Sequence, residues 1–562
     1  MERSTESSTD KNDTAVASPG TLTDRNQLNA ILSRAVTASR LNESDSLSDD
    51  LRLIAAIGAR FLGRAAYAWL VPEDEHEHLA ACARLAERVH TEVDATVVLQ
   101  ACLFEAIYPA VDRIAIPEHV FRDLDQEPQA RTFSYQQMHG GVPAPAQGLG
   151  SPWAGGAVPE LAKPEALRWF YYRACRYIDA GYEALHIGQV HLIAGTDRGY
   201  RNVERLVAAI RAYAARAARR GWVILDAHSH GIARNGRLLF DCTSRPLSAR
   251  PIVSQPEAIA LLRRGTVLPG LHPGGWPCRD APVLLEVDNW HGYSLAPDPS
   301  LWIQGRRRAA AGRWGWDDIS WFAHQEPRLR REFLAYAHAW AQLQGPEWHF
   351  QPPIRRPLGR AELLQPDGTP IKYYHANRSS AACPGGFGDE DAIAALWRSN
   401  SSRSEPENTT ADLATAAAIT DSGLQVPEPV ALVGEVQEHI GGIVGDASCP
   451  WSRLHHIGGG VFARRFVFPL TCDLRFTVAT GGTLTDPTND GGLSGGSPFA
   501  LRVARPGQCI EISFDYEAKT VRAIDCATRD SVLVPPEQAV DPTQRYAAQE
   551  RDLLRNVPPD WY

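Results

Sequence analysis

Three residues able to transfer protons or bind a metal ion lie at alternating positions after one apolar run. The run Trp222–Leu225 leads into Asp226, His228 and His230, and Gly231 follows. Side chains two residues apart on a β-strand point to the same side. We therefore expect these three side chains to project together from one strand end. The alternative is a polar strand end that merely caps a sheet.

A second strand-like run, Val283–Asn289, carries Glu286 and Asp288 on one face. Acid–base chemistry at a glycosidic bond uses two carboxyl groups, one protonated and the other ionised. We therefore assign Asp226 and Glu286 as a catalytic pair, with Asp288 as the alternative partner. The competing structural explanation is that Glu286 or Asp288 forms a buried ion pair with an arginine.

Further polar or aromatic side chains follow the apolar runs and are expected to bind substrate. With His228, they are Glu105, Gln189, Asn289, Trp290, His324, Gln325 and His375. Trp290 belongs to a group of tryptophans that continues with Trp302, Trp314, Trp316 and Trp321. A tryptophan face packs against the apolar face of a sugar ring, so a carbohydrate-like substrate, small or polymeric, is predicted. The same tryptophans could instead pack a loop onto the sheet.

The segment Asp226–Gly231 resembles the Asp-x-His-x-His strand end of the amidohydrolases and of the polymerase-and-histidinol-phosphatase hydrolases. The resemblance implies that His228 and His230 would ligate a divalent metal, with His291, His324 and His375 as further ligands. In those families the motif follows the first barrel strand, whereas three βα-like units precede it here. A metal-dependent hydrolase is therefore the alternative to a glycoside-hydrolase-like enzyme without a cofactor. A non-enzymatic carbohydrate-binding barrel protein is the third hypothesis.

The elements that would position these residues alternate between strand-like and helix-like patterns, as in βα units. The predicted strands are Arg64–Leu70, Val97–Ile107, Ala184–Leu192, Val223–His228, Val283–Asn289, Ile319–His324, Trp348–Pro352 and Ile371–Ala376. The predicted helices are His78–Val89, Pro164–Ala180, Asn202–Arg219, Pro327–Leu343 and Asp389–Trp397. We predict an α/β fold, a (β/α)8 TIM-like barrel over residues 49–402. An open doubly wound sheet would require a glycine-rich phosphate loop after an early strand, and none is visible.

The remaining segments differ in composition. Residues 1–48 are predicted to be a disordered polar tail, and residues 403–425 a linker. Short alternating runs between turn residues predict an antiparallel β-sandwich over residues 426–540, and residues 541–562 a tail with a short helix. Four cysteines of this sandwich could form two disulfides or remain buried thiols: Cys449, Cys472, Cys509 and Cys526.

Composition limits the expected partners. The chain has 562 residues and a net charge of −9 without a long basic run, so nucleic acid is not expected. No apolar run of about 18 residues and no signal peptide are visible, so no membrane partner is expected. A cytoplasmic location is the simplest prediction, and export by a route without a cleaved signal stays open. The sequence leaves substrate identity, stereochemical outcome and oligomeric state open.

Overall fold

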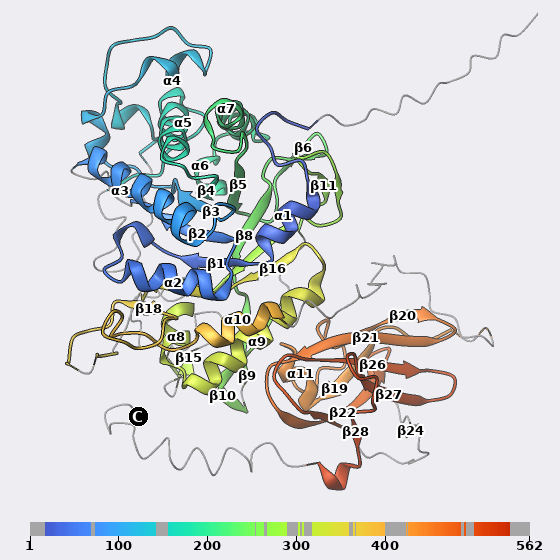
Figure 1. Ribbon diagram of the computed structural model, residues 1–562. Coiled ribbons are helices and arrows are strands. Elements are labelled where there is room, and N and C mark those ends of the chain that lie inside the picture. The colour runs from blue at the N-terminus through green and yellow to red at the C-terminus, as the bar shows by residue number, and fades with distance from the viewer. Residues whose placement is uncertain are drawn as a thin grey trace, which may run out of the picture.

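The chain forms two units, each built around one large sheet (Figure 1). The computed structural model describes residues 17–68, 74–141, 156–252, 254–262, 267–288, 302–303, 306–307, 317–358, 363–365, 367–398, 423, 425–484, 488–489 and 499–539. The first unit is mixed α/β, and the second is mostly antiparallel β-sheet. Within these ranges, no helix is long and apolar enough to cross a membrane.

The sheet of the first unit is curled, and most of its strands are parallel. Each of the following strands pairs in parallel with the next: β1 (Ala35–Ala38), β2 (Phe61–Ala66), β3 (Val98–Cys102), β4 (Ala184–Gln189), β5 (Ile224–His228), β8 (Cys242–Pro246), β13 (Val283–Glu286) and β16 (Trp348–Gln351). Strand β17 (Pro353–Pro357) follows β16 after Pro352 and pairs in parallel with β1. One stretch of chain therefore pairs with both β13 and β1.

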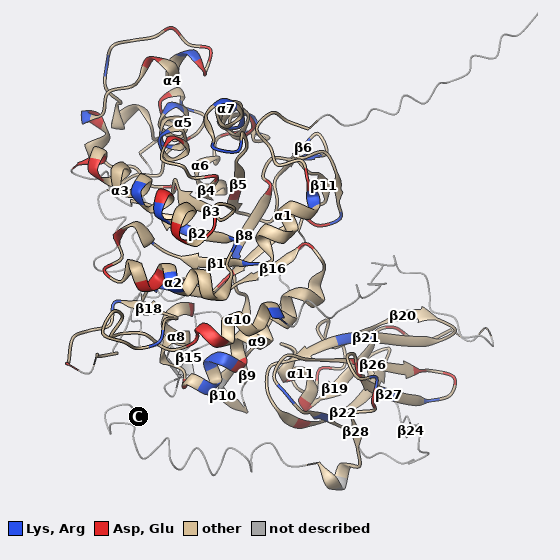
Figure 2. Cartoon of the chain, viewed as in Figure 1, with Lys and Arg blue, Asp and Glu red and all other residues tan. Residues whose placement is uncertain are grey.

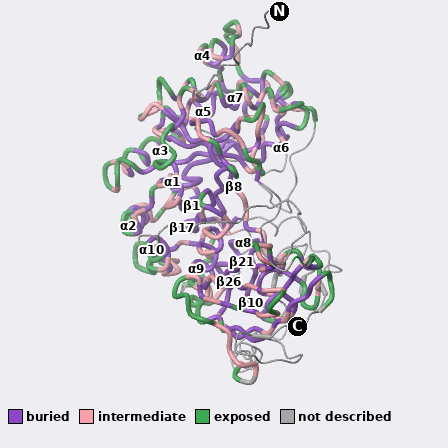
Figure 3. Tube along the Cα trace, turned by 90° about the vertical axis from the view of Figure 1, so that its right-hand side faces the viewer, coloured by how far each residue is buried: buried purple, intermediate pink, exposed green. Residues whose placement is uncertain are grey.

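Helices separate many of these strands along the chain and carry much of the exposed charge. They are α2 (Leu47–Ile57), α3 (Glu75–Arg88), α5 (Pro164–Asp179), α7 (Arg201–Ala217), α9 (Pro327–Gln344) and α10 (Glu390–Arg398). Charged residues mark α2, α3 and α10 (Figure 2). The strands are mainly buried, whereas the exposed residues lie mainly on the helices and loops (Figure 3). The helices predicted from the sequence agree with α3, α5, α7, α9 and α10 within a few residues.

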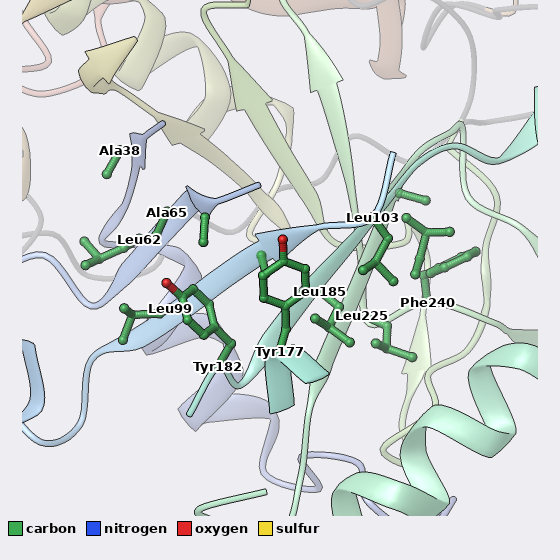
Figure 4. Close-up of a cluster of buried hydrophobic side chains, with 14 of the residues drawn as sticks. Ala38, Leu62, Ala65, Leu99, Leu103, Tyr177, Tyr182, Leu185, Leu225 and Phe240 are labelled. Atoms are coloured by element: carbon green, nitrogen blue, oxygen red, sulfur yellow. The ribbon is translucent and has the colours of Figure 1, made fainter. Parts of the chain in front are cut away.

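The two sides of the strands carry different side chains, because residues alternate along each strand. Leu62, Leu99, Leu185 and Leu225 belong to one large apolar core together with Tyr177 of α5 (Figure 4). A separate apolar cluster lies on the opposite face of the strands, where it packs against helix α1 (Arg25–Leu32). It contains Leu28, Ile31 and Leu32 of the helix and the strand residues Ala35, Phe61, Val98, Ala184, Ile224, Cys242 and Leu284. Two positions further along, the same strand faces carry Thr37, Gly63, Gln100, His186, Asp226, Ser244 and Glu286. A polar layer therefore follows an apolar layer toward the carboxyl ends of the strands.

The prediction of a strand at Ile319–His324 is wrong, because this segment forms helix α8 (Asp318–His324). The Asp317 side chain caps the helix by accepting a hydrogen bond from the backbone N–H of Ser320 at 2.8 Å. Every residue from 318 to 323 is buried, so the run shows no helical alternation between apolar and polar positions. The predicted strand Ile371–Ala376 exists as β18 (Tyr373–His375), but it pairs antiparallel with β17.

Three strands with parallel pairing were not predicted, β1, β8 and β17. Strand β1 lies within residues 1–48, so the prediction of a disordered tail is wrong where α1 and β1 form. Asp24 caps α1, and the apolar residues of the helix close the apolar cluster described above. Strand β8 has the sequence Cys-Thr-Ser-Arg-Pro, which lacks the apolar pattern of a buried strand. Asp226 therefore lies on the fifth parallel strand rather than the fourth.

The second unit contains one extended sheet with alternating burial along its strands. Its main strands are β19 (Val430–Gly434), β20 (Arg453–Gly458), β21 (Val461–Phe468), β22 (Cys472–Thr480), β25 (Phe499–Val503), β26 (Gln508–Asp515), β27 (Thr520–Asp525) and β28 (Leu533–Val534). Helix α11 (Glu435–His439) follows β19 directly. Ile252 and Ala260, from the hairpin of β9 (Ala249–Ile252) and β10 (Gln255–Leu261), join the core of this sheet. The short helix expected within residues 541–562 lies outside the described residues.

The other short elements are α4 (Glu118–Arg122), α6 (Val190–Ile193), β6 (Ala233–Arg234), β7 (Arg237–Leu238), β11 (Gly270–Leu271), β12 (Pro277–Cys278), β14 (Trp302–Ile303), β15 (Arg306–Arg307), β23 (Thr483–Leu484) and β24 (Thr488–Asn489).

Candidate functional site

Glu286, at the end of β13, forms a two-point ion pair with Arg64 of β2. Arg64 Nε donates to Glu286 Oε2 at 2.7 Å, and Arg64 Nη2 donates to Glu286 Oε1 at 2.7 Å. Both side chains are almost completely buried. Burial alone would raise the pKa of Glu286, but the Arg64 charge and its two hydrogen bonds hold it well below its usual value. Glu286 is therefore ionised at neutral pH.

Arg64 reaches Glu286 from an unusual backbone conformation. Its φ angle is 60°, in the left-handed region that non-glycine residues rarely adopt. The register between β2 and β3 shifts between Leu62 and Ala66, so Arg64 lies in a β-bulge. The side-chain oxygen Oε1 of Gln100 accepts a hydrogen bond from the Arg64 backbone N–H at 3.0 Å. Bulges redirect side chains, and this one allows the guanidinium to reach the end of β13.

Asp288 and His228 lie next to this ion pair. Asp288 Oδ1 accepts a hydrogen bond from Arg356 Nη2, and Asp288 Oδ2 lies 3.6 Å from Arg64 Nη2. His228 Nε2 lies 3.5 Å from Glu286 Oε1 and 3.7 Å from Asp288 Oδ2. We call Arg64, His228, Glu286, Asp288 and Arg356 the charged cluster. Burial and the neighbouring Arg64 charge lower the pKa of Arg356 to about 10.

His228 has two possible hydrogen-bonding roles in the charged cluster. Arg64 Nη2 lies 2.8 Å from His228 Nε2 and can only donate, so this contact is a hydrogen bond when Nε2 carries no proton. With a proton on Nε2, the ring would instead donate toward Glu286 or Asp288. The position of one proton therefore changes the bonding of the cluster. Of the five residues of the charged cluster, His228 alone is partly exposed.

Asp226 has a different environment from the other two predicted catalytic acids. The carboxylate is fully buried and accepts hydrogen bonds from Gln100 Nε2 at 2.8 Å and from Ser244 Oγ. His186 Nδ1 lies 2.9 Å from Asp226 Oδ1. The His186 ring meets the His228 ring edge to face, with centroids 4.7 Å apart. Asp226 thus orients His186 beside His228.

Glu105 and Gln189 form a second buried pair near this site. Glu105 accepts hydrogen bonds from the Gln189 side chain at 2.7 Å and from its backbone N–H at 3.1 Å. Gln189 lies opposite His228 in the register between β4 and β5. Phe104, next to Glu105, packs against His186 with ring centroids 6.3 Å apart. The predicted binding residues Glu105 and Gln189 therefore lie beside the charged cluster.

Other predicted binding residues lie elsewhere or outside the described residues. Asn289, Trp290 and His291 fall outside them. His324 Nδ1 lies 2.7 Å from the Ser320 carbonyl oxygen, and Gln325 donates to the Trp321 carbonyl oxygen at 2.9 Å, so α8 holds both. His375 Nδ1 lies 3.8 Å from Asp50 Oδ1. Trp321 is buried and packs edge to face on Phe333, so it has a packing role.

Several residues of the site were not singled out from the sequence: Arg64, Gln100, His186, Ser244 and Arg356. One signal was available for Arg64, which interrupts the apolar run Phe61–Ala66 and must pair with an acid if that strand is buried. Its partner could not be identified, because Glu286 lies on a strand that is not adjacent to β2 in the sheet.

The charged cluster does not fit a divalent metal ion. One donor atom each from His228, Glu286 and Asp288 lie within 4.8 Å of one another, a spacing that could suit an ion. Both carboxylates, however, already bond to arginines, and a cation there would contact the guanidiniums of Arg64 and Arg356. His230, the second ligand expected from the metal-hydrolase resemblance, is exposed and is not part of this group.

Comparison with known proteins gives only remote similarities. No family model and no curated protein matches the chain. The native Nostoc punctiforme debranching enzyme has 13% identity over 88% of this chain and 99% of its own, with a TM-score of 0.36. The same enzyme soaked with acarbose has 12% identity over 84% and 97%, with a TM-score of 0.34. Pullulanase from Bacillus acidopullulyticus has 14% identity over 20% and 15%, with a TM-score of 0.15. These TM-scores are too low to show that the chain shares a fold with these enzymes.

Proposed function

We propose that this chain is a glycoside-hydrolase-like enzyme that acts on a carbohydrate-like substrate and whose curled sheet is a barrel of the (β/α)8 type. Support for the barrel comes from the eight parallel strand positions and from the continuous stretch β16–β17, which pairs with both β13 and β1. Support for an active site comes from the polar layer toward the carboxyl ends of the strands, where barrel enzymes carry their reactive groups.

The observation that carries the proposal is the ionised Glu286, held by Arg64 beside Asp288 and His228. An ionised carboxylate can stabilise or attack the positively charged sugar ring of a glycosidic transition state. We assign this role to Glu286. Asp288 becomes its partner, because Asp288 Oδ2 lies 3.7 Å from Nε2 of the same histidine, whereas the contacts of the Asp226 carboxylate are with Gln100, Ser244 and His186.

The leaving-group oxygen of a glycoside needs a proton, and we assign its transfer to His228, with Asp288 beside it. His228 Nε2 lies 3.7 Å from Asp288 Oδ2, so a proton carried on Nε2 would lie near Asp288, which can help to orient the ring. Asp226 then acts through His186 as a positioning residue. Substrate contacts are assigned to Glu105, Gln189, Asn289 and Trp290.

The spacing of the two acids also gives a stereochemical expectation. Oxygens of Glu286 and Asp288 lie within 4.8 Å of each other. Retaining glycosidases place their carboxyl groups about 5–5.5 Å apart, and inverting ones about 6.5–9.5 Å apart. The proposal therefore includes net retention at the anomeric carbon, which proton NMR of the first-formed product can measure.

The second unit is proposed to be an accessory domain that supports the first. It lies against the first unit at α9, where a Cβ on Gly507 would be 3.0 Å from the Ala335 carbonyl oxygen. Ser254 Oγ of the first unit also donates to Glu438 Oε2 at 2.6 Å.

The proposal is tested with purified full-length protein on a panel of 4-nitrophenyl α- and β-glycosides and on oligosaccharides. We expect hydrolysis of at least one substrate and a loss of roughly 10²–10⁴-fold in kcat for Glu286→Gln. Asp389→Asn is the matched control, since it weakens another buried pair, Arg330 Nε–Asp389 Oδ2 at 2.6 Å. The control should keep kcat.

Two further measurements separate the hypotheses. Sodium azide should restore product formation to Glu286→Ala, because a small anion can attack from the space that the carboxylate leaves. Unchanged activity of Glu286→Gln, or no hydrolysis of any substrate, would contradict the proposal. Stoichiometric zinc, manganese or iron in the purified protein would favour the metal-dependent hydrolase instead.

A further inference from the structure

Two cysteines of the second unit lie directly beside each other on neighbouring strands. The Sγ atoms of Cys509 and Cys526 are 3.1 Å apart. Ile510 lies opposite Asp525 in the antiparallel pair β26–β27, and the Cys526 backbone N–H donates to the Cys509 carbonyl oxygen at 2.9 Å. Directly opposed residues of antiparallel strands have Cα separations within the range of disulfides. A disulfide bond is about 2.05 Å long, so the two sulfur atoms need to approach by only about 1 Å.

These two cysteines also differ from the other eight in their exposure. The other eight are buried, whereas Cys509 and Cys526 are only partly buried. Burial raises the pKa of buried thiols, for example that of Cys278 to about 11. The pKa of Cys526 is instead lowered, first by the hydrogen bond from the Cys509 thiol and then by the nearby charge of Arg465. Of the two thiols, that of Cys526 should therefore react faster with a reagent in solvent than that of Cys509.

We propose that Cys509 and Cys526 are a dithiol modification site, which a small-molecule disulfide such as oxidised glutathione converts into a disulfide between β26 and β27. The site lies next to the contact between the two units. Cys509 packs against the core of the first unit, and Gly507 two residues earlier approaches Ala335 of α9. The disulfide would link β27 covalently to β26, the strand that lies near α9.

The reaction has two exchange steps. The Cys526 thiolate attacks one sulfur of oxidised glutathione, forms a mixed disulfide and releases one glutathione thiolate, which takes up a proton from water. The Cys509 thiol then loses its proton to solvent, and its sulfur attacks the Cys526 sulfur. The second glutathione leaves as a thiolate and is protonated. Two protein thiols are oxidised, and one glutathione disulfide is reduced to two thiols.

The test treats the full-length protein with excess oxidised glutathione, blocks remaining thiols with N-ethylmaleimide and maps peptides by mass without reduction. We expect one peptide pair joined through Cys509 and Cys526, while the other cysteines stay unlinked. The Tm of the second unit should rise by at least about 4 °C and return on reduction. Separate N-ethylmaleimide adducts on Cys509 and Cys526 after the treatment would overturn the proposal.

Single variants test the order of the two steps. Cys509→Ser should accumulate a stable glutathione adduct on Cys526, because no second thiol resolves it. Cys526→Ser should acquire adduct at Cys509 more slowly, and faster modification of Cys509 would overturn the assignment of Cys526 as the attacking thiol. Cys449→Ser, which removes a buried thiol of the same unit, is the control and should leave the joined peptide pair unchanged.

Discussion

Arg64 and Glu286 form a two-point ion pair between strands that are not neighbours in the sheet. The two hydrogen bonds are both 2.7 Å long, and the strands β2 and β13 are separated by other strands in either direction. The pair therefore spans the concave side of the curled sheet, within the polar layer that follows the apolar cluster around α1. Its charges are shielded from water and depend on each other.

Removing Arg64 should destabilise the protein strongly, because Glu286 would remain as a buried charge without its main partner. We expect Arg64→Ala to lower the free energy of unfolding by about 3–5 kcal/mol. Arg64→Lys keeps the charge but loses the parallel hydrogen bonds, so it should cost less. Urea unfolding monitored by circular dichroism measures both. A loss below about 1 kcal/mol for Arg64→Ala would show that the pair is not needed for folding.

Asp226→Asn should reduce both stability and activity. The structure surrounds the Asp226 carboxylate with Gln100, Ser244 and His186. An amide cannot accept all of these hydrogen bonds, so we expect a cost of about 1–3 kcal/mol. The matched control is Asp525→Asn, a buried acid that accepts from Gln508 Nε2 at 2.7 Å in the second unit. Equal kcat values in the two variants would mean that Asp226 has no role in catalysis.

Alternation along strands was sufficient to predict that Asp226 and His228 share one strand end and that Glu286 and Asp288 share another. Their partners could not be predicted, because Arg64 reaches Glu286 through a bulge with positive φ and Arg356 follows Pro352 on a different strand. The alternative of an ion pair between these acids and arginines was open from the sequence, and both pairs exist. Helix α8 was mistaken for a strand because its residues are buried on all sides, although Asp317 and Ser320 have the spacing of a helix cap.

Stability should fall as the pH decreases from about 6.5 to about 4. Burial lowers the pKa of His439 to about 4, and burial with the nearby His338 lowers that of His349 to about 4. Between these values and the usual histidine pKa, the unfolded chain binds more protons than the folded protein. Each such histidine therefore contributes stability that is present above pH 6.5 and is lost as the pH falls toward 4.

This pH effect can be assigned to one residue by substitution. Each histidine should add a slope of up to about 1.4 kcal/mol per pH unit to the free energy of unfolding in that range. His439→Gln should remove up to one such slope, measured by urea unfolding at several pH values. His455→Gln, at an exposed position of the same unit, should leave the slope unchanged. An unchanged slope in His439→Gln would contradict the buried, neutral state of His439.

Gly188→Ala should disturb the buried pair of Glu105 and Gln189 beside the charged cluster. Gly188 has a φ of +79°, and a Cβ at this position would lie 2.0 Å from Glu105 Oε2. The substitution therefore combines backbone strain with a clash against a buried carboxylate.

Gly236 separates the two effects, since its φ is +74° and a Cβ there would meet nothing within 4 Å. Gly236→Ala should show the strain alone, about 1 kcal/mol. Gly188→Ala should cost about 1–3 kcal/mol more and should raise KM if Glu105 binds substrate. Equal losses of stability in the two variants would mean that Glu105 moves aside freely, and it could not then be a fixed part of the site.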